Sequence, residues 1–206
     1  PIPDTLAGSL MELTLQNGSR VFYPGIETQT LGYNGNYLGP TLILQKGQQV
    51  TLRVHNQIDA TTTTHWHGLH VAPMNDGSPH NPILAGETWS PSFTVMDKAA
   101  TYWYHPHPHG KTLAQVVKGA AGFIIVRDSE EASLHLPRTY GVDDVPLVFQ
   151  WKTFDAAKQI TELDEADNEV MTNGTINGVL NLPGQVVRLR LLNGSSHRFF
   201  NFGFAD

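Results

Sequence analysis

The chain has no cysteine among its 206 residues. Disulfides and every thiolate metal site are therefore excluded. Charge is also scarce, since only 16% of residues are charged, and 13 Lys and Arg stand against 19 Asp and Glu for a formal net charge of −6. The few basic residues are unclustered, so nothing indicates a nucleic-acid-binding surface.

Long hydrophobic runs are absent as well. The most apolar stretch, GAAGFIIV, is bounded by Lys118 and Arg127 and is far shorter than the roughly 18 residues of a membrane helix. No secretory signal peptide is visible in the sequence. We therefore expect no membrane span in this chain.

Glycine and proline are plentiful, at 19 and 13 residues, and short apolar runs alternate with turn signals. Asn17-Gly18 predicts a hairpin between two strands, and a further pair of strands is predicted around Gly47. A short helical turn is expected near residues 111–119. This spacing of strands favours an all-β fold, an antiparallel sandwich or barrel.

Two units are predicted along the chain. Residues 1–128 are interpreted as a complete first domain, residues 129–144 as a linker, and residues 145–206 as the first part of a second sandwich. The end of the chain is apolar and lacks evident packing partners, which indicates that the second unit is incomplete. Its aromatic residues are Phe199, Phe200, Phe202 and Phe204.

Four histidines form two His-x-His pairs, His65–His67 in THWHGLH and His105–His107 in TYWYHPHPHG. Residues i and i+2 of an extended segment project to the same face, so each pair offers two imidazoles roughly 6–7 Å apart at about 3.3 Å per residue. That spacing is wide for one ion but suits two ions about 3.5–4 Å apart. Two such pairs on adjacent strands would supply four ligands to a multi-metal cluster.

Imidazole ligands without thiolate suit copper, zinc, iron or nickel. A single His-x-His is weak evidence, because it arises by chance and a lone strand histidine is usually only a polar side chain. Two pairs within one domain favour a metal site. We expect the aromatic residues beside them to exclude water from it, namely Trp66, Tyr102, Trp103 and Tyr104.

The other histidines are interpreted differently. His55 alternates with apolar residues and is expected on the opposite face of its strand. His70 and His109 flank the motifs and are interpreted as surface residues or supports of the ligands. No role is assigned to the loop histidines, which are His80, His135 and His197.

The paired motifs and their surroundings resemble the amino-terminal domain of multicopper oxidases, of the bacterial cuprous-oxidase, laccase and bilirubin-oxidase types. The likeness runs from PTLILQKGQQVTLRVHN to VVRLRLLNGSSHRFFNF and covers nearly the whole chain. It implies a cupredoxin-like Greek-key β-sandwich. It also implies an oxidase that couples one-electron oxidation of substrate to reduction of O2 to water, located in the periplasm, the cell envelope or outside the cell.

The resemblance also implies roles for individual residues. An acid after the first pair helps to deliver protons in related bacterial enzymes, and Asp76 falls at that position. Because Asp-Gly is a strong turn signal, a turn residue is the alternative interpretation of Asp76. The implied copper ligands are His65 for the type 2 ion, His67 and His105 together for one type 3 ion, and His107 for the other.

The family takes half of its eight cluster histidines, and the cysteine of its type 1 copper site, from a carboxy-terminal domain. This chain has neither, so alone it is not expected to be a complete oxidase. We expect its partner to be the remaining C-terminal polypeptide, nicked or separate, with O2 and a small reducing substrate as the reactants. Which substrate is used is open, because the family binds it near the type 1 site.

Two alternatives stay open. One is a non-catalytic envelope or cell-division scaffold of the same fold, although such relatives typically lose the copper ligands and all four are present here. The other is a simple copper- or zinc-binding module, which would not need a second domain. A two-domain blue-copper enzyme such as nitrite reductase is excluded, since it requires a cysteine.

Overall fold

The computed structural model describes residues 1–162, 167–182 and 184–203. Almost all regular structure in these residues is β-strand, arranged in three sheets, so the expected all-β fold is confirmed. The expectation that the terminal aromatic residues lack packing partners is wrong for Phe200 and Phe202, whose ring centroids lie 6.1 and 4.7 Å from that of Phe149. Phe199 is exposed, and Phe204 lies outside the described residues.

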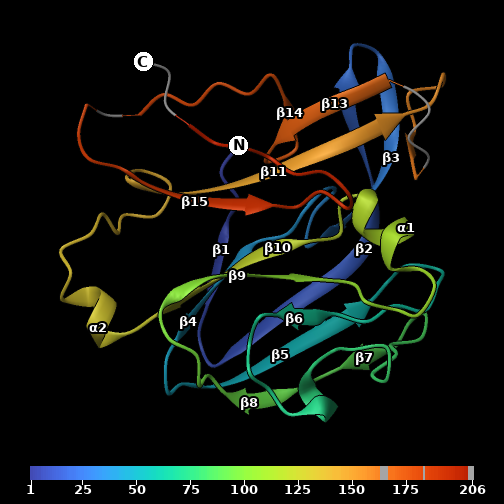
Figure 1. The fold of residues 1–206 in the computed structure, drawn as a ribbon. Helices are drawn as coiled ribbons and strands as arrows, with labels where there is room; N and C mark the ends of the chain where they lie inside the picture. Colours follow the sequence, from blue (N-terminus) through green and yellow to red (C-terminus); the bar gives the residue numbers. More distant parts are fainter. Residues whose placement is uncertain (163–166, 183, 204–206) are drawn as a thin grey trace.

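The first two sheets face each other and form a sandwich, seen in the lower part of Figure 1. In spatial order the first sheet contains β1 (Thr5–Ala7), β4 (Thr41–Gln45), β10 (Gly122–Arg127), β9 (Ala100–His105) and β6 (His65–His67). The second contains β3 (Ile26–Tyr33), β2 (Leu10–Tyr23), β5 (Gln49–Asn56) and β7 (Thr88–Trp89), with β8 (Ser92–Thr94) also paired to β5.

The core of the sandwich lies between these sheets and follows from alternation along the strands. On β5 the predicted apolar face is fully buried, with Val50, Leu52 and Val54 all at 0% exposure. They pack with residues of the facing sheet such as Leu44 and Ile124. The sandwich therefore provides a rigid support for β6 and β9, the strands that carry the histidines.

The third sheet lies across one side of the sandwich, at the top of Figure 1. Its strands are β12 (Ile160–Thr161), β11 (Asp144–Phe154), β13 (Asp167–Thr172) and β14 (Thr175–Ile176), with β15 (Arg188–Asn193) also paired to β11. One face of this sheet contributes Val148 and Phe154 to a second apolar cluster, together with Tyr37 and Phe123 of the sandwich.

The hairpin predicted at Asn17-Gly18 is wrong. Both residues lie inside β2, one continuous strand, and the chain turns instead at Pro24-Gly25, where Gly25 has a φ of +75°. A Cβ on Gly18 would lie 2.6 Å from the Cα of Asn36. Gly18 is therefore needed because another backbone segment approaches it closely. In the sequence, such a glycine cannot be distinguished from the glycine of a turn.

Three short helices complete the described structure: the 3-10 helix η1 (Pro73–Asn75), α1 (Thr112–Val117) and α2 (Ser129–Ala132). The helical turn expected after the second histidine pair is confirmed as α1. The segment 129–144, interpreted as a linker, contains α2 and runs to the first residue of β11. No helix in the described part of the chain is long and apolar enough to span a membrane.

Candidate metal centre

Strands β6 and β9 bring the two histidine pairs together. They are antiparallel neighbours, with His65 opposite His105 and His67 opposite Trp103. Directly opposed residues share a face of the sheet, so both members of the first pair point to the same side as His105. The expected arrangement on adjacent strands is confirmed, except that His107 lies beyond the end of β9.

The His65 ring lies at the centre of the four imidazoles. Its centroid is 5.6 Å from that of His67 and 5.6 Å from that of His105. The His107 ring, which comes from the loop after β9, is 5.5 Å from His65 and 5.7 Å from His105. Four imidazoles thus form one cluster at this edge of the sheet.

Hydrogen bonds orient two of these rings. His65 Nδ1 lies 2.9 Å from the carbonyl oxygen of Asp76, and His105 Nδ1 lies 2.8 Å from that of Pro106. A carbonyl only accepts, so each Nδ1 carries the proton and each Nε2 keeps a free lone pair. Such a partner on the other ring nitrogen is usual for metal-binding histidines.

The protonation states also suit metal binding, because an imidazole must be neutral to act as a ligand. Burial lowers the pKa of His105 to about 4, with the neighbouring histidines acting in the same direction against the Pro106 carbonyl. Burial, followed by the charges of His65 and His107, also lowers the pKa of His67. Both rings are therefore neutral at pH 7.

Two of the donor atoms lie close enough to bind one ion. His67 Nδ1 lies 3.2 Å from His105 Nε2, a separation open to two imidazole nitrogens that bind one ion at about 2.0 Å each. Within the described residues, no group of three or more His, Asp or Glu side chains is arranged to hold a single ion.

The aromatic residues around the cluster do not all lie where they were expected. Trp66 and Tyr104 alternate with the histidines and are fully buried in the sandwich core, and Tyr102 packs against the same core. Only Trp103 among the four lies beside the imidazoles, with its ring stacked on His105 at a centroid distance of 4.2 Å. The period of two that aligns the histidines on one face places their immediate neighbours on the other.

Asp76 lies against the first pair. Its Oδ2 is 3.3 Å from His65 Nδ1, in addition to the contact of its carbonyl oxygen with the same atom. The next residue, Gly77, has a φ of +72°, and a Cβ there would lie 1.7 Å from the carbonyl oxygen of Thr64. Glycine therefore lets this loop approach β6 closely enough for Asp76 to reach His65.

The remaining histidines stay outside the cluster. His55 points away from the core face of β5, as expected, and its Nδ1 lies 2.7 Å from Thr88 Oγ1. His70 is paired with Asp97 at 2.5 Å, and its side chain is 86% exposed. His70 is therefore a surface residue, one of the two interpretations given above.

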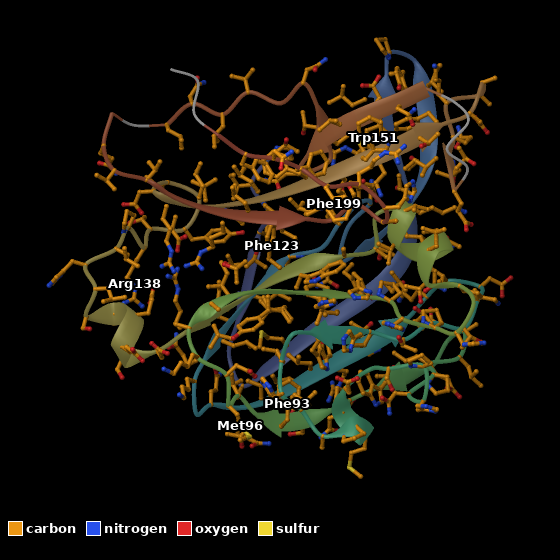
Figure 2. All side chains as sticks on the ribbon, in the orientation of Figure 1. Phe93, Met96, Phe123, Arg138, Trp151 and Phe199 are labelled. Carbon is orange, nitrogen blue, oxygen red and sulfur yellow. The ribbon has the colours of Figure 1, made fainter. Side chains whose placement is uncertain are left out.

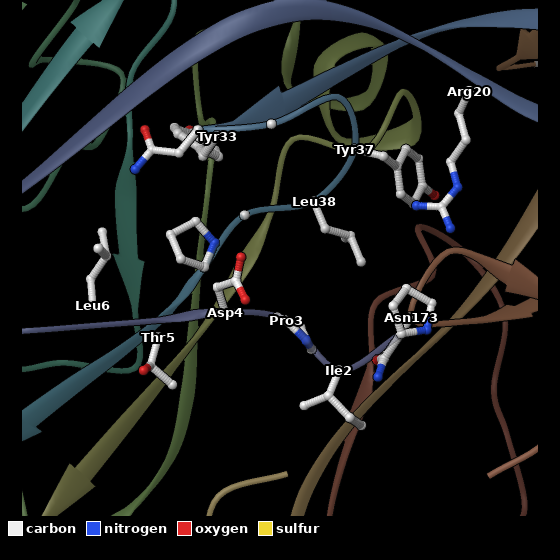
Figure 3. Close-up of a pocket in the computed structure, with 15 residues that line it drawn as sticks. Ile2, Pro3, Asp4, Thr5, Leu6, Arg20, Tyr33, Tyr37, Leu38 and Asn173 are labelled. Atoms are coloured by element: carbon white, nitrogen blue, oxygen red, sulfur yellow. The ribbon is translucent and has the colours of Figure 1, made fainter.

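The larger cavities do not lie at the four paired histidines, although His55 lines one of about 510 Å³. One of about 320 Å³ lies beside the N-terminus and is lined by residues that include Pro3, Tyr37 and Asn173 (Figure 3). No histidine lines it. The four imidazoles instead gather at the edge strand β6 of the first sheet.

The structure also adds a residue that sequence reasoning did not identify. Thr63 Oγ1 accepts a hydrogen bond of 2.8 Å from the backbone N–H of His107. The two residues are 44 positions apart, and threonine is common, so no local signal in the sequence marks this contact.

Comparison with known proteins agrees with these features. Residues 14–131 match the protein family described as "Multicopper oxidase". The multicopper oxidase mco of Staphylococcus aureus is 41% identical over 94% of this chain and 44% of that protein. The cell division protein FtsP of Escherichia coli is 31% identical over the whole chain and 45% of its own length.

Solved structures show the same likeness. The laccase-like multi-copper oxidase CueO from Ochrobactrum sp., which has oxidase activity towards lignin model compounds and lignosulfonate, superposes with a TM-score of 0.90 at 38% identity, covering 96% of this chain and 47% of that one. A laccase from Pediococcus acidilactici gives a TM-score of 0.88 at 37% identity, over 95% and 45%. The expected cupredoxin-like fold is confirmed, and the chain spans a little under half the length of these relatives.

Proposed function

Because the chain belongs to the multicopper oxidase family, we propose that its paired histidines hold part of a trinuclear copper cluster in an oxidase that couples one-electron oxidation of a small substrate to reduction of O2 to water. The observation that carries this proposal is the convergence of two His-x-His pairs from adjacent strands. The proposed ligands are His65 for a type 2 ion, His67 and His105 for one type 3 ion, and His107 for the other.

The atoms support the pairing of His67 with His105, since two of their nitrogens face each other at 3.2 Å. The protein's part is to hold these rings neutral and oriented before copper binds. Trp103, stacked on His105, limits rotation of that ring and excludes water from one side of it.

Asp76 is the proposed proton donor for oxygen reduction. Its carboxylate is close to the cluster, with Oδ2 3.3 Å from His65 Nδ1, and its side chain is 24% exposed. A carboxyl group in this position contacts both solvent and a ligand, which is the placement that a proton relay requires. Its main-chain carbonyl orients His65 at the same time.

The other cluster ligands and a cysteine-bearing type 1 site are proposed to lie in a C-terminal part that docks on this chain. The length of the relatives supports this, and so does the outer face of the third sheet. Val170 is 43% exposed there, and Leu189 and Leu191 of β15 are 39% and 44% exposed. Phe199, labelled in Figure 2, is 97% exposed. An apolar surface of this kind marks a binding interface.

The copper content of the full-length protein tests the assignment. We expect His67→Ala and His107→Ala each to lose cluster copper, measured by elemental analysis, and to reduce O2 consumption to background. His55→Ala is the matched control, because His55 lies on another strand and bonds to Thr88. If either cluster variant kept its full copper content and oxidase activity, the assignment would be wrong.

The second candidate is a scaffold without copper, supported by the 31% identity to cell division protein FtsP. The presence of all four histidines, brought together by β6 and β9, favours the oxidase. A simple copper-binding module is the third. Copper-free full-length protein would favour the scaffold, and copper without O2 consumption would favour the binding module.

A location in the periplasm, the cell envelope or outside the cell is part of the proposal and rests on the family resemblance. Fractionation of cells that produce the full-length protein tests it. Recovery of the protein from the cytoplasm alone would contradict this location without affecting the copper assignment.

A further inference from the structure

A run of four threonines, residues 61–64, leads directly into the first histidine pair. Thr62, Thr63 and Thr64 are all at 0% exposure, which is unusual for polar side chains unless each has a partner. We propose that Thr63 is a positioning residue for the copper site, which fixes the place of His107 relative to the first pair. This inference rests on the proposed copper-binding function.

His107 needs such support because no strand holds it. β9 ends at His105. His107 then lies between Pro106 and Pro108, neither of which has a backbone N–H. The amide of His107 is therefore the only backbone donor in residues 106–108. It donates to Thr63 Oγ1 at 2.8 Å. The carbonyls of the two prolines accept only from residues nearby in sequence, His105 for Pro106 and Lys111 and Thr112 for Pro108, so the Thr63 bond is the one that links His107 to the strand of the first pair.

The acceptor is itself held firmly from both sides. Thr62 Oγ1 donates to Gln115 Oε1 of α1 at 2.7 Å, and Gln115 Nε2 donates back to the carbonyl of Thr61 at 3.0 Å. On the other side, Thr64 Oγ1 lies 2.9 Å from the hydroxyl of Tyr33. Thr63 thus sits in a segment fixed to α1 and to β3.

The hydrogen bond between Thr63 and His107 links the first histidine pair to the second. Thr63 is two residues before His65, so a contact from its hydroxyl to the His107 amide links the fourth histidine to the first. His105 does not depend on this contact, because it is held by its pairing with His65 across β6 and β9. Loss of the Thr63 hydroxyl should therefore loosen His107 and leave the other three rings in place.

Two variants of Thr63 test the proposal in the full-length protein. Thr63→Val keeps the shape but removes the acceptor, and we expect copper affinity, measured by titration with a competing chelator, to fall roughly 10- to 100-fold, the range for residues that orient metal ligands. Thr63→Ser keeps the hydroxyl and should retain copper close to the wild-type affinity. The paramagnetic resonance signal of type 2 Cu(II) should stay unchanged in both variants, because its proposed ligand His65 keeps its place.

Thr41→Val is the matched control, since it removes a buried hydroxyl of β4 whose partner, at 2.7 Å, is the hydroxyl of Tyr140, away from the histidines. It should lower the stability of the fold and leave copper affinity unchanged. If Thr63→Val fails to fold, Thr63→Ser and Thr63→Ala give the same comparison, because they differ only in the hydroxyl.

Three results would overturn the inference. One is a folded Thr63→Val that binds copper as tightly as wild type. Another is an equal loss of copper in Thr63→Val and Thr41→Val, which would indicate a general effect of stability. A wild-type protein that binds no copper would overturn the proposed function together with this inference, whereas the first two results leave the proposed function intact.

Discussion

At the scale of single residues, the site depends on a glycine, Gly77, as well as on the imidazoles. Gly77 allows the loop that carries Asp76 to rest on the backbone of Thr64, and so places a carbonyl oxygen on His65 Nδ1. Gly47 has a comparable φ of +84°, but nothing lies within 4 Å of the position its Cβ would take. Both glycines have a left-handed backbone, but only Gly77 would also suffer a steric clash from a Cβ. Comparing substitutions at the two positions therefore distinguishes the free-energy cost of backbone conformation from that of the clash.

We expect Gly77→Ala to lower the free energy of unfolding by more than about 3 kcal/mol, the upper end for a left-handed residue alone, because its Cβ would overlap the carbonyl of Thr64. Gly47→Ala should cost only the conformational part, about 1–2 kcal/mol. Urea unfolding of both variants measures the difference. Equal losses would show that the loop moves away from β6 without penalty.

At the scale of elements, a buried lysine joins the third sheet to the sandwich. Lys152 of β11 is 3% exposed, and its Nζ donates to the carbonyl oxygens of Val116 and Val117 at the C-terminal end of α1. A cation there is favourable for the helix dipole. Burial nevertheless lowers the pKa of Lys152 to about 7, far below the usual value for lysine.

The lowered pKa of Lys152 predicts how stability depends on pH. Between about pH 7 and pH 10 the unfolded chain keeps this proton and the folded chain loses it, so the free energy of unfolding should rise with pH by about 1 kcal/mol per unit from this group. Below pH 7 both states are protonated and the contribution is constant.

Lys152→Met removes this titration. From pH 7 to pH 10, the unfolding free energy of the wild type should therefore rise relative to that of the variant. Lys98→Met is the matched control, because Lys98 forms an exposed pair with Glu130. A wild-type and a Lys152→Met curve that run parallel over this range would contradict the predicted titration.

At the scale of the whole molecule, buried ion pairs connect the end of the sandwich with the third sheet. Asp144, the first residue of β11, is at 0% exposure and accepts two bonds from Arg190 of β15, at 2.6 and 2.9 Å, and one from Arg127 of β10, at 2.6 Å. Burial opposes the ionisation of Asp144, but these two arginines outweigh it and lower its pKa. Three strands from both parts therefore meet on one carboxylate.

Removing this charge should leave Arg190 without a charged partner, while Arg127 keeps Glu131 at 3.0 Å. We expect Asp144→Asn to lower the free energy of unfolding by about 3–5 kcal/mol, as for other broken buried pairs. Glu12→Gln, which breaks an exposed pair with Arg53, should cost at most about 1 kcal/mol. Thermal or chemical unfolding of the two variants provides the comparison, and a similar small effect in both would argue against Asp144 as a junction of the two parts.

Much of the fold could be predicted from local patterns. The alternation in β5 and the turn at Gly47 depend on neighbours in sequence, and both are found in the structure. The hairpin at Gly18 was wrong because that glycine serves a contact with Asn36. In the sequence, a glycine required by contact with a distant backbone segment cannot be distinguished from a glycine required by a turn.

For the site, the sequence by itself determined that His65–His67 and His105–His107 present imidazoles in pairs without any thiolate, because the covalent spacing of an extended chain places i and i+2 on one face. Only the tertiary structure decided which nitrogens face each other, that Trp66 is turned to the core, and that Thr63 holds His107. These contacts depend on the register of strands distant in sequence, and no local pattern encodes that register.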